Sequence, residues 1–593
     1  HGRIADAPAS AQAQDVALLL GTRGLPARVL PSDDAAELTA GLRFLPVHTA
    51  GRAIGVLGPP IRRAEVRRWM VGAGLDDVGG TTLRFGYEHP ERVHRLITMG
   101  SSSGGPTLMV PAGLTEWLKV LQKGYRQPSF ETMRELVDVT IHPRAVLYDD
   151  CVIGAGVSGL RAAQRLSAQG RRVRLLEARD RVGGRTEGGE LCGEAVDVGG
   201  QWIGPTQHTA VALCEELGLA LYPQFADGQR LMEIHGRLRA YRGTVPRMSL
   251  LGLLDADRAI RRVDRMAATL DPVRPWASTH AAEWDRITVA QWLQQSMYTR
   301  GGRTLVDILT RAILTCEAHE VSMLGFLSYI AGAGKVEDLA EVHGDGAQKY
   351  KVKGGAFQIA QRLAERLPPG TLHLNTPVHA ITQTDRGVVV RHAQGELQAR
   401  RVIVALPPAL AARIHFDASL PAARLQLHSR MPMGSVIKAL IAYERPFWKD
   451  RGLSGEVISD QGPFGPVLDA TPPGSPHGFL VGFFDGAHSR RLAGQPTEVR
   501  RDACIASLTR YFGDAAAQPI GYLDKDWISD PWSQGCYVGV PSPGALSACG
   551  HALRDPCGRI HWAGTETASR WLGYIDGAIS AGERAADEVM AAG

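Results

Sequence analysis

The chain has 593 residues. Because this length exceeds what a single hydrophobic core can organise, we expect several lobes. Hydrophobic residues make up 44% and charged residues 21%, which excludes a disordered chain and is typical of a globular enzyme. The formal net charge is only +5 and no long run of one sign occurs, so we expect no nucleic-acid partner.

The eight cysteines are scattered, without a C-x-x-C pair or a His/Cys cluster at zinc spacing, so we expect neither a disulfide framework nor a metal site. No apolar run reaches the roughly 18 residues that a membrane span requires, and residues 1–30 lack the layout of a secretory signal. We therefore expect a cytoplasmic protein. Removal of an N-terminal signal stays open, because the chain begins at His1 rather than at Met.

Residues 1–147 are predicted to form an N-terminal α/β extension. Asp15–Gly21 and Arg52–Gly58 are short apolar runs typical of strands, and Ala64–Ala73 is typical of a helix.

Part of this extension resembles a different enzyme class. Thr81–Gly100 and Tyr125–Met133 resemble parts of an α/β-hydrolase, specifically a carbon–carbon bond hydrolase, a likeness that covers residues 80–148. Where that family has its nucleophile elbow, Asp76–Gly80 contains no serine. Gly100–Gly104 fits the G-x-S-x-G pattern but follows the next strand. The hydrolase-like segment ends before it could supply the acid and the histidine of a catalytic triad. We therefore expect a non-catalytic extension used for packing, for partner contact or for forming a homodimer.

A dinucleotide-binding pattern begins at residue 148. Cys151–Ile153 is typical of a buried parallel strand. The glycines of a G-x-G-x-x-G pattern follow at once: Gly154, Gly156 and Gly159. Such glycines let the backbone approach a pyrophosphate at the N-terminus of the next helix, whereas a simple packing turn is the alternative.

The rest of this unit follows in the required order. Leu160–Ala168 predicts a helix that stops at Gly170, and Arg172–Leu176 predicts the second strand. Glu177 stands 18 residues after the last glycine, where its carboxylate can accept a hydrogen bond from a ribose hydroxyl. This order predicts a β–α–β unit for either a nicotinamide or a flavin cofactor.

The segments on either side of the chain's centre resemble the flavin amine oxidase family. Glu177–Thr186 is similar to the second half of the family's FAD fingerprint, and Arg559–Thr567 with Trp571–Ala586 is similar to its C-terminal signature. The resemblance implies FAD as the cofactor. It also implies these cofactor-binding residues: Gly154, Gly156, Gly159, Glu177, Gly184, Arg185, Val378, Trp527, Cys536, Gly564 and Glu566.

Within the family, the monoamine oxidase branch is the most similar. Trp532–Tyr537 resembles the motif through which that branch attaches its flavin by a cysteine thioether. By this resemblance Cys536 is the attachment point, with an ordinary buried cysteine as the alternative. Tyr537 and Tyr574 match the two walls of an aromatic cage for the amine, with core packing as the alternative.

Three further residues take their expected roles from the same resemblance. Lys438 matches a lysine that holds a water against the flavin, although a lysine at the end of an apolar run can also reach out to solvent. Trp527 matches a tryptophan beside the flavin or packs in the core, and Gln348 matches a cavity-lining glutamine or lies in a surface turn. The expected catalytic residues are thus Lys438, Tyr537 and Tyr574, and the expected substrate contacts are Gln348, Tyr537 and Tyr574.

The two FAD signatures lie about 400 residues apart, so the cofactor-binding domain has to be discontinuous. We expect an α/β fold in which a Rossmann-like FAD-binding domain is interleaved with an α+β substrate domain. The expected boundaries are 1–147 for the extension, 148–225, 353–427 and 530–593 for the FAD-binding domain, and 226–352 and 428–529 for the substrate domain.

The resemblance implies FAD-dependent oxidative deamination of an amine. Hydride would pass to the flavin, water would hydrolyse the imine to an aldehyde or ketone, and O2 would be reduced to H2O2. Two alternatives stay open: an FAD amine dehydrogenase that uses a carrier-protein electron acceptor, and a catalytically decayed flavin-bound interaction protein. The sequence identifies neither the amine nor the oligomeric state.

Overall fold

The computed structural model describes residues 53–57, 95–99, 147–243, 247–417 and 420–592. The chain divides into two compact units, His1–Ala145 and Val146–Gly593. In the first unit, strands β1 (Ala53–Leu57) and β2 (Arg95–Met99) pair antiparallel. Strand β1 lies inside the expected strand at 52–58, whereas the strand expected at 15–21 and the helix expected at 64–73 lie outside the described residues.

The second unit contains an eight-stranded sheet with the path β12-β4-β3-β15-β14-β13-β16, and β22 pairs with β15. The strands are β3 (Leu147–Ile153), β4 (Val173–Leu176), β12 (Leu372–His373), β13 (Val378–Thr384), β14 (Gly387–His392), β15 (Gly395–Val404), β16 (His415–Phe416) and β22 (Ile560–Trp562). Strand β3 runs parallel to both β4 and β15, and β22 runs parallel to β15. Segments from the beginning, middle and end of the unit therefore build one sheet.

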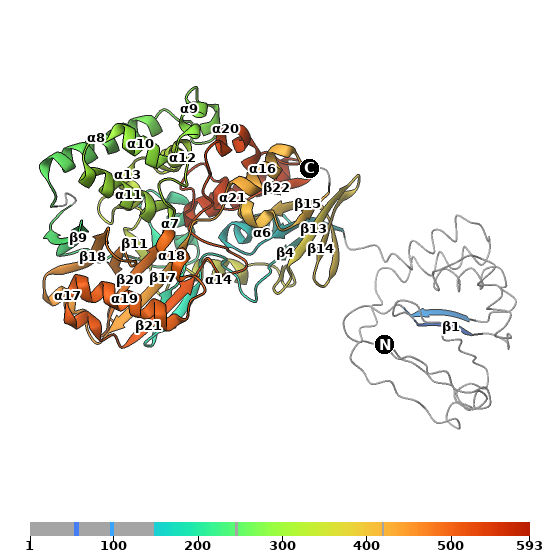
Figure 1. The fold of residues 1–593 in the computed structure, drawn as a ribbon. Coiled ribbons are helices and arrows are strands. Elements are labelled where there is room, and N and C mark those ends of the chain that lie inside the picture. The colour runs from blue at the N-terminus through green and yellow to red at the C-terminus, as the bar shows by residue number, and fades with distance from the viewer. Residues whose placement is uncertain (1–52, 58–94, 100–146, 244–246, 418–419, 593) are drawn as a thin grey trace, which may run out of the picture. The chain divides into compact units, whose positions relative to one another are not determined.

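Helices α6 (Val157–Ala168) and α21 (Ile575–Ala591) accompany this sheet (Figure 1). A Cβ at Gly582 would lie 2.2 Å from the Ser158 carbonyl oxygen, so the glycine permits the two helices to approach closely. The other helices on this side are α7 (His208–Glu216), α14 (Gln358–Glu365), α15 (Pro408–Ala411), α16 (Ala422–Arg430) and the 3-10 turn η5 (Thr565–Thr567).

A second, seven-stranded sheet has the order β10-β9-β18-β19-β20-β17-β21. Its strands are β9 (Gln229–Ile234), β10 (Arg237–Tyr241), β17 (Val436–Tyr443), β18 (Leu453–Ser459), β19 (Val467–Asp469), β20 (Gly478–Asp485) and β21 (Gly521–Asp526). Every residue of β17 and β20 is buried, because both faces of these central strands are covered. One face of β17, with Ile437, packs against α19 (Thr497–Phe512), and the other face carries Lys438.

The remaining helices include some that pack against this second sheet and others that pack mainly against one another (Figure 1). They are α8 (Leu250–Ala267), η2 (Pro275–Ala277), α9 (Ala281–Arg286), α10 (Val289–Ser296), α11 (Arg300–Leu314), α12 (Met323–Ala333), α13 (Val336–Ala340), α17 (Phe447–Asp450), α18 (Gly486–Leu492), η3 (Asp514–Ala517), α20 (Ala545–Cys549) and η4 (Gly550–Leu553).

Two small sheets are built from strands that lie, along the sequence, between strands of the two large sheets. Strands β5 (Gly188–Leu191) and β6 (Glu194–Asp197) form a hairpin. Strand β11 (Tyr350–Val352) pairs with β7 (Trp202–Ile203) and β8 (Leu221–Pro223). The expected boundary at 352/353 thus assigns β11 to a different domain from both strands with which it pairs.

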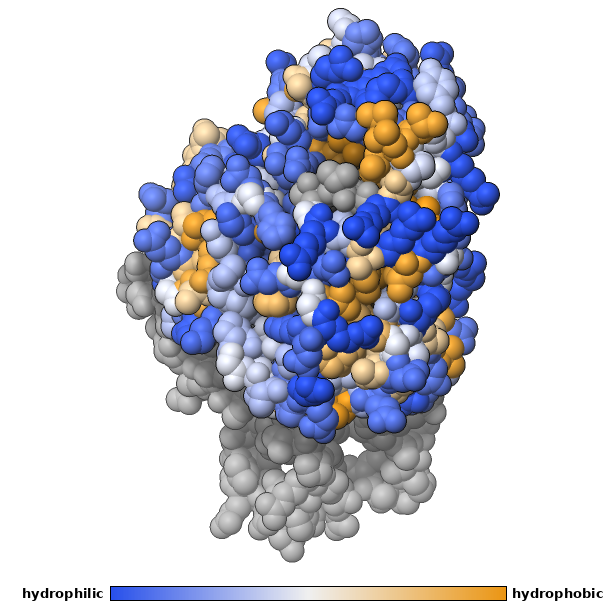
Figure 2. Space-filling model, turned by 90° about the vertical axis from the view of Figure 1, so that its left-hand side faces the viewer, coloured by the Kyte–Doolittle hydropathy of each residue, from blue (hydrophilic) through white to orange (hydrophobic). Residues whose placement is uncertain are grey.

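Figure 2 shows one face of the molecule, on which hydrophilic side chains predominate and apolar ones form small groups. That distribution is ordinary for a surface in contact with water. Across the described residues, no helix has both the length and the apolar character needed to cross a membrane. All eight cysteines lie in the described part of the chain and are free thiols.

Candidate active site

A cavity of about 330 Å³ is lined by residues from both large sheets and the segments that join them. Most of the residues singled out from the sequence line it: Gly154, Gly156, Glu177, Gly184, Arg185, Gln348, Val378, Lys438, Trp527, Cys536, Tyr537, Gly564 and Tyr574. The other two, Gly159 and Glu566, lie behind the wall and support it. The structure therefore brings together residues that are up to about 400 positions apart in the chain.

The glycine turn after β3 is shaped by close backbone contacts. A Cβ at Gly159 would lie 1.9 Å from the Gly154 carbonyl oxygen, so only glycine allows α6 to start there. Gly154 itself has φ +97°, a conformation that glycine adopts without strain. No side chain caps α6 at Gly156, so the first N–H groups of the helix are available to an anion. This cradle fits a diphosphate.

Glu177 is fixed at the end of β4 beside the same turn. One carboxylate oxygen accepts from the backbone N–H of Ala155 at 2.7 Å and the other from that of Arg179 at 3.0 Å. The Arg179 side chain in turn donates to Asp530 at 2.8 Å and to Ser533 at 2.7 Å. The carboxylate is 3% exposed and its residue lines the cavity, which fits the ribose contact expected for it.

Arg185 joins the first and last segments of the unit. It donates two hydrogen bonds to the Glu566 carboxylate, at 2.6 and 3.0 Å, and one to the Tyr537 carbonyl oxygen at 2.8 Å. Glu566 is fully buried and also accepts from the Gly539 N–H at 3.1 Å. A guanidinium held by a bidentate pair to a fully buried carboxylate is rigid, so Arg185 holds the Tyr537 backbone in place.

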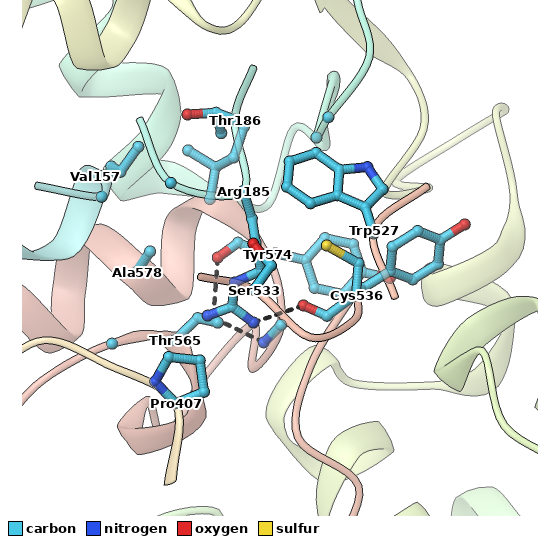
Figure 3. A pocket seen from close by; sticks show the side chains of 18 of the residues that line it. Val157, Arg185, Thr186, Pro407, Trp527, Ser533, Cys536, Thr565, Tyr574 and Ala578 are labelled. Carbon is cyan, nitrogen blue, oxygen red and sulfur yellow. Dashed lines mark hydrogen bonds between the residues drawn. The ribbon is translucent and has the colours of Figure 1, made fainter. Parts of the chain in front are cut away.

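Trp527 and Cys536 lie beside each other in the wall, with Tyr574 nearby (Figure 3). The Trp527 indole N–H donates to the Val198 carbonyl oxygen at 3.1 Å, which fixes the ring at 1% exposure. Burial raises the pKa of the Cys536 thiol to about 12, so the free side chain is a neutral thiol at physiological pH.

Lys438 does not reach out to solvent, because its residue is only 3% exposed. Its ammonium donates to the Gly199 carbonyl oxygen at 2.7 Å and to Gln201 Oε1 at 2.5 Å, and lies 5.6 Å from the Trp202 ring centroid. Burial lowers the pKa of Lys438, and the attraction of Asp197 partly opposes that shift. The lysine is therefore a buried, hydrogen-bonded amine at the cavity wall.

Two tyrosines form aromatic walls. Tyr537 meets Phe483 edge to face, with centroids 5.8 Å apart, and Tyr574 lies 6.1 Å from Tyr329. The Tyr574 hydroxyl donates to the Leu339 carbonyl oxygen at 3.4 Å. Burial raises the pKa of both Tyr537 and Tyr574, so both phenols stay neutral and neither exchanges protons in the working pH range.

Gln348 lies in the cavity wall rather than in a surface turn. Its Nε2 donates to the Leu339 carbonyl oxygen at 3.1 Å, whereas its Oε1 is buried without a hydrogen-bond partner. A buried acceptor without a partner costs free energy, which a ligand N–H would recover.

Sequence reasoning missed several lining residues, among them Trp202, Tyr329, Glu456 and Phe483. Tyr329 and Phe483 belong to elements that are buried almost throughout, where no periodicity distinguishes a cavity residue from a core residue. Glu456 did carry a signal, because it is the one charged residue in the otherwise uncharged strand β18.

The fold and this cavity together define an oxidoreductase that binds a dinucleotide cofactor beside an aromatic substrate chamber. Residues 157–590 match the family model "Flavin containing amine oxidoreductase". The chain belongs to this family, and it carries out FAD-dependent oxidative deamination of amines.

Individual relatives agree with the family match. A protein of Dictyostelium discoideum described as "Probable flavin-containing monoamine oxidase A" is 38% identical over 75% of this chain and 98% of its own length. The flavin-containing amine oxidase A of Canis lupus familiaris is 36% identical over 75% of this chain and 85% of its own length.

Solved structures show the same fold. Wild-type putrescine oxidase bound to putrescine is 32% identical, with a TM-score of 0.72 over 75% of this chain and 99% of that chain. The cyclohexylamine oxidase of Brevibacterium oxydans gives the same values. The hydrolase-like reading of residues 80–148 receives no support from these comparisons.

Proposed function

We propose that the protein oxidises an amine bound as the free base between Tyr537 and Tyr574, and that O2 accepts the electrons. The observation that carries this proposal is the convergence of Lys438, Cys536 and the two tyrosines on one cavity. When bound, FAD supplies the hydride acceptor for the substrate's α-carbon.

The chain's own groups would hold FAD along one side of the cavity. The uncapped N-terminus of α6 and its glycines receive the diphosphate, and Glu177 receives a ribose hydroxyl. Gly184, Arg185, Val378, Trp527 and Gly564 line the path toward the substrate chamber. Glu566 acts behind Arg185, which it holds in place.

Tyr537 and Tyr574 would present two neutral aromatic faces to the substrate nitrogen and keep bulk water from the reacting carbon. The unpartnered Oε1 of Gln348 would accept an N–H of the amine. Only the neutral amine has a lone pair to support hydride loss, so the rate of oxidation should rise with pH through the pKa of the bound amine. The imine product would then be hydrolysed by water.

Lys438 would position a water and, in its protonated form, favour the negative charge that forms when O2 is reduced to H2O2. Cys536 would hold FAD through a thioether, since its thiol lines the cavity beside Trp527. The boundaries of the two interleaved domains, the cytoplasmic location and the homodimer stay predictions from the sequence.

The experiment mixes the purified flavoprotein anaerobically with primary, secondary and aromatic amines, including putrescine and cyclohexylamine, and follows the flavin absorbance. Bleaching that accelerates as the pH rises, followed by recovery and H2O2 release on adding O2, is the expected result. Bleaching without recovery in O2 would indicate a dehydrogenase that needs a carrier protein. No bleaching by any amine would contradict the proposed function.

A further inference from the structure

A charged cluster of three residues lies against the substrate chamber. Glu456 in β18 lines the cavity, and its Oε2 lies 3.0 Å from Nε of Arg230 in β9. The same guanidinium donates to Glu341 at 3.2 and 2.9 Å. Arg230 is 4% exposed, so this cluster is fixed inside the protein. None of its members has a role in the chemistry proposed above.

The register of the seven-stranded sheet places Glu456 relative to Lys438. Lys438 in β17 pairs with Phe483 in β20, β20 pairs with β19, and Val457 of β18 pairs with Val467 of β19. Neighbouring strands are about 4.8 Å apart, and the register displaces the two residues by two positions along the strands, so the Glu456 backbone lies roughly 16 Å from that of Lys438. Both side chains line the same cavity. Glu456 therefore lines a part of the chamber that is far from Lys438, which we call the far end.

The sheet that carries Lys438 and Glu456 also contributes apolar residues to the cavity wall. The cavity residues that the sheet and helix α11 contribute there are Ile308, Leu309, Ile313, Ile458, Leu468 and Phe483. Their side chains offer no hydrogen bonds, so this part of the chamber suits a hydrocarbon chain.

The charges at the far end do not balance. Glu341 and Glu456 share a single guanidinium, and no other Lys or Arg forms an ion pair with Glu456 among the described residues. Burial, with a further contribution from Glu341, raises the pKa of Glu456 to about 7, although Arg230 opposes the shift. A carboxylate that is only 15% exposed and lacks a full counter-charge is costly, and a ligand cation would reduce that cost.

A second polar group in the chamber also lacks a partner. Gln348 Oε1 is buried and unpaired, while its Nε2 and the Tyr574 hydroxyl both donate to the Leu339 carbonyl oxygen. The chamber thus has an N–H acceptor near the aromatic walls, an apolar surface and an acidic far end.

We propose that Glu456, held by Arg230 and Glu341, is a binding site for a second cationic group of the substrate. The preferred substrates are then linear diamines or polyamines, in which one nitrogen is oxidised between the tyrosines while a distal ammonium pairs with Glu456. This inference rests on the proposed function, because it extends the same chamber.

The test compares kcat/KM for α,ω-diamines of about four to ten carbons with that for n-alkylamines of the same length, at constant pH near neutrality. For the best chain length we expect the diamine to exceed its matched monoamine by about tenfold or more, since a charge-assisted pair forms only with the diamine. In Glu456→Gln this ratio should fall to within about threefold of one.

Glu233→Gln is the matched control. Glu233 lies on the neighbouring strand β9, is buried and pairs with Arg510, but does not line the cavity. Its removal should leave the diamine-to-monoamine ratio unchanged. Flavin content and thermal midpoint, measured on both variants, separate loss of the fold from loss of selectivity.

The wild-type protein alone can overturn the proposal. Equal kcat/KM for diamines and monoamines at every chain length would do so while leaving amine oxidation intact. A strong diamine preference that survives in Glu456→Gln would also reject the assignment to this residue. Absence of flavin reduction by any amine would instead reject the proposed function itself.

Discussion

Lys438 has a proposed role in O2 reduction that does not require it to act as an acid or base on the substrate. Its ammonium is held by the Gly199 carbonyl oxygen and by Gln201, and its burial is compensated partly by Asp197. These contacts hold the amino group against the cavity wall, where the proposed reduction of O2 would generate negative charge that protonated Lys438 would stabilise.

Replacing this lysine should therefore affect one half of the catalytic cycle. In Lys438→Met we expect the rate constant of flavin reoxidation by O2 to fall by about tenfold or more, with a smaller effect on anaerobic reduction by the amine. Stopped-flow absorbance measures both steps separately. Lys449→Met is the control, because Lys449 pairs with Asp469 and does not line the cavity. An equal fall in the rate constants of flavin reduction and of reoxidation would contradict the proposed role of Lys438 in O2 reduction.

Cys536 gives a second prediction at the scale of one residue. If it carries the flavin, acid denaturation should leave the yellow colour with the wild-type polypeptide and release it from Cys536→Ala. Cys549→Ala, a change at a buried cysteine outside the cavity, should behave as wild type. Release of free FAD from the wild-type protein would show that the cofactor is held without a covalent bond.

Helix α6 shows how strongly one element depends on close backbone packing. Its first turn contains Gly159, whose Cβ position lies 1.9 Å from the Gly154 carbonyl oxygen. In Gly159→Ala the backbone has to move. We therefore expect the free energy of unfolding to fall by about 3 kcal/mol or more and the protein to bind little flavin. Thermal unfolding and flavin content measure these effects.

The other end of the same helix provides the comparison. Gly170 has φ +74°, and no atom lies within 4 Å of the position of its Cβ. In Gly170→Ala the free energy of unfolding should fall by only about 1 kcal/mol, because alanine is strained in the left-handed conformation. This variant should retain its flavin. Similar losses in the two variants would show that close contact is not what makes Gly159 necessary.

The elements that the sequence predicted best are those with a local signal. The strand–turn–helix from Cys151 to Ala168 and the second strand were predictable because their glycines and apolar runs are contiguous. The helix begins at Val157 rather than at Leu160, since a glycine in the first turn hides the start of the helical pattern.

The substrate chamber was less predictable. Lys438, Tyr537, Tyr574 and Gln348 could be assigned only through resemblance to a family. The walls supplied by β18, β19 and β20 depend on register between distant strands, and a buried strand without alternation does not show which face meets a cavity. Glu456 was visible as a lone charge, but its partners Arg230 and Glu341 are far away in the sequence.

At the scale of the whole molecule, residues 146–593 form a compact unit that includes the complete cavity. The relative from Dictyostelium discoideum matches 75% of this chain with 98% of its own length. A chain that begins at Val146 should therefore fold, bind flavin and keep kcat/KM within about threefold of the full-length value.

The same truncation tests the role of the N-terminal extension. If residues 1–145 support a homodimer, light scattering should show a fall from dimer to monomer on their removal. An unchanged particle size, with full activity, would contradict a role in self-association.

The sheet order also has a consequence for biosynthesis. Strand β22 pairs with β15, and α21 packs against α6, so residues translated about 400 positions after β3 complete the sheet that β3 begins. The nascent polypeptide cannot assemble its nucleotide cradle while its C-terminal segment is still inside the ribosome. We therefore expect the flavin to be loaded only after β22 and α21 have left the ribosome, and a stop codon before β22 should yield a colourless product that is degraded.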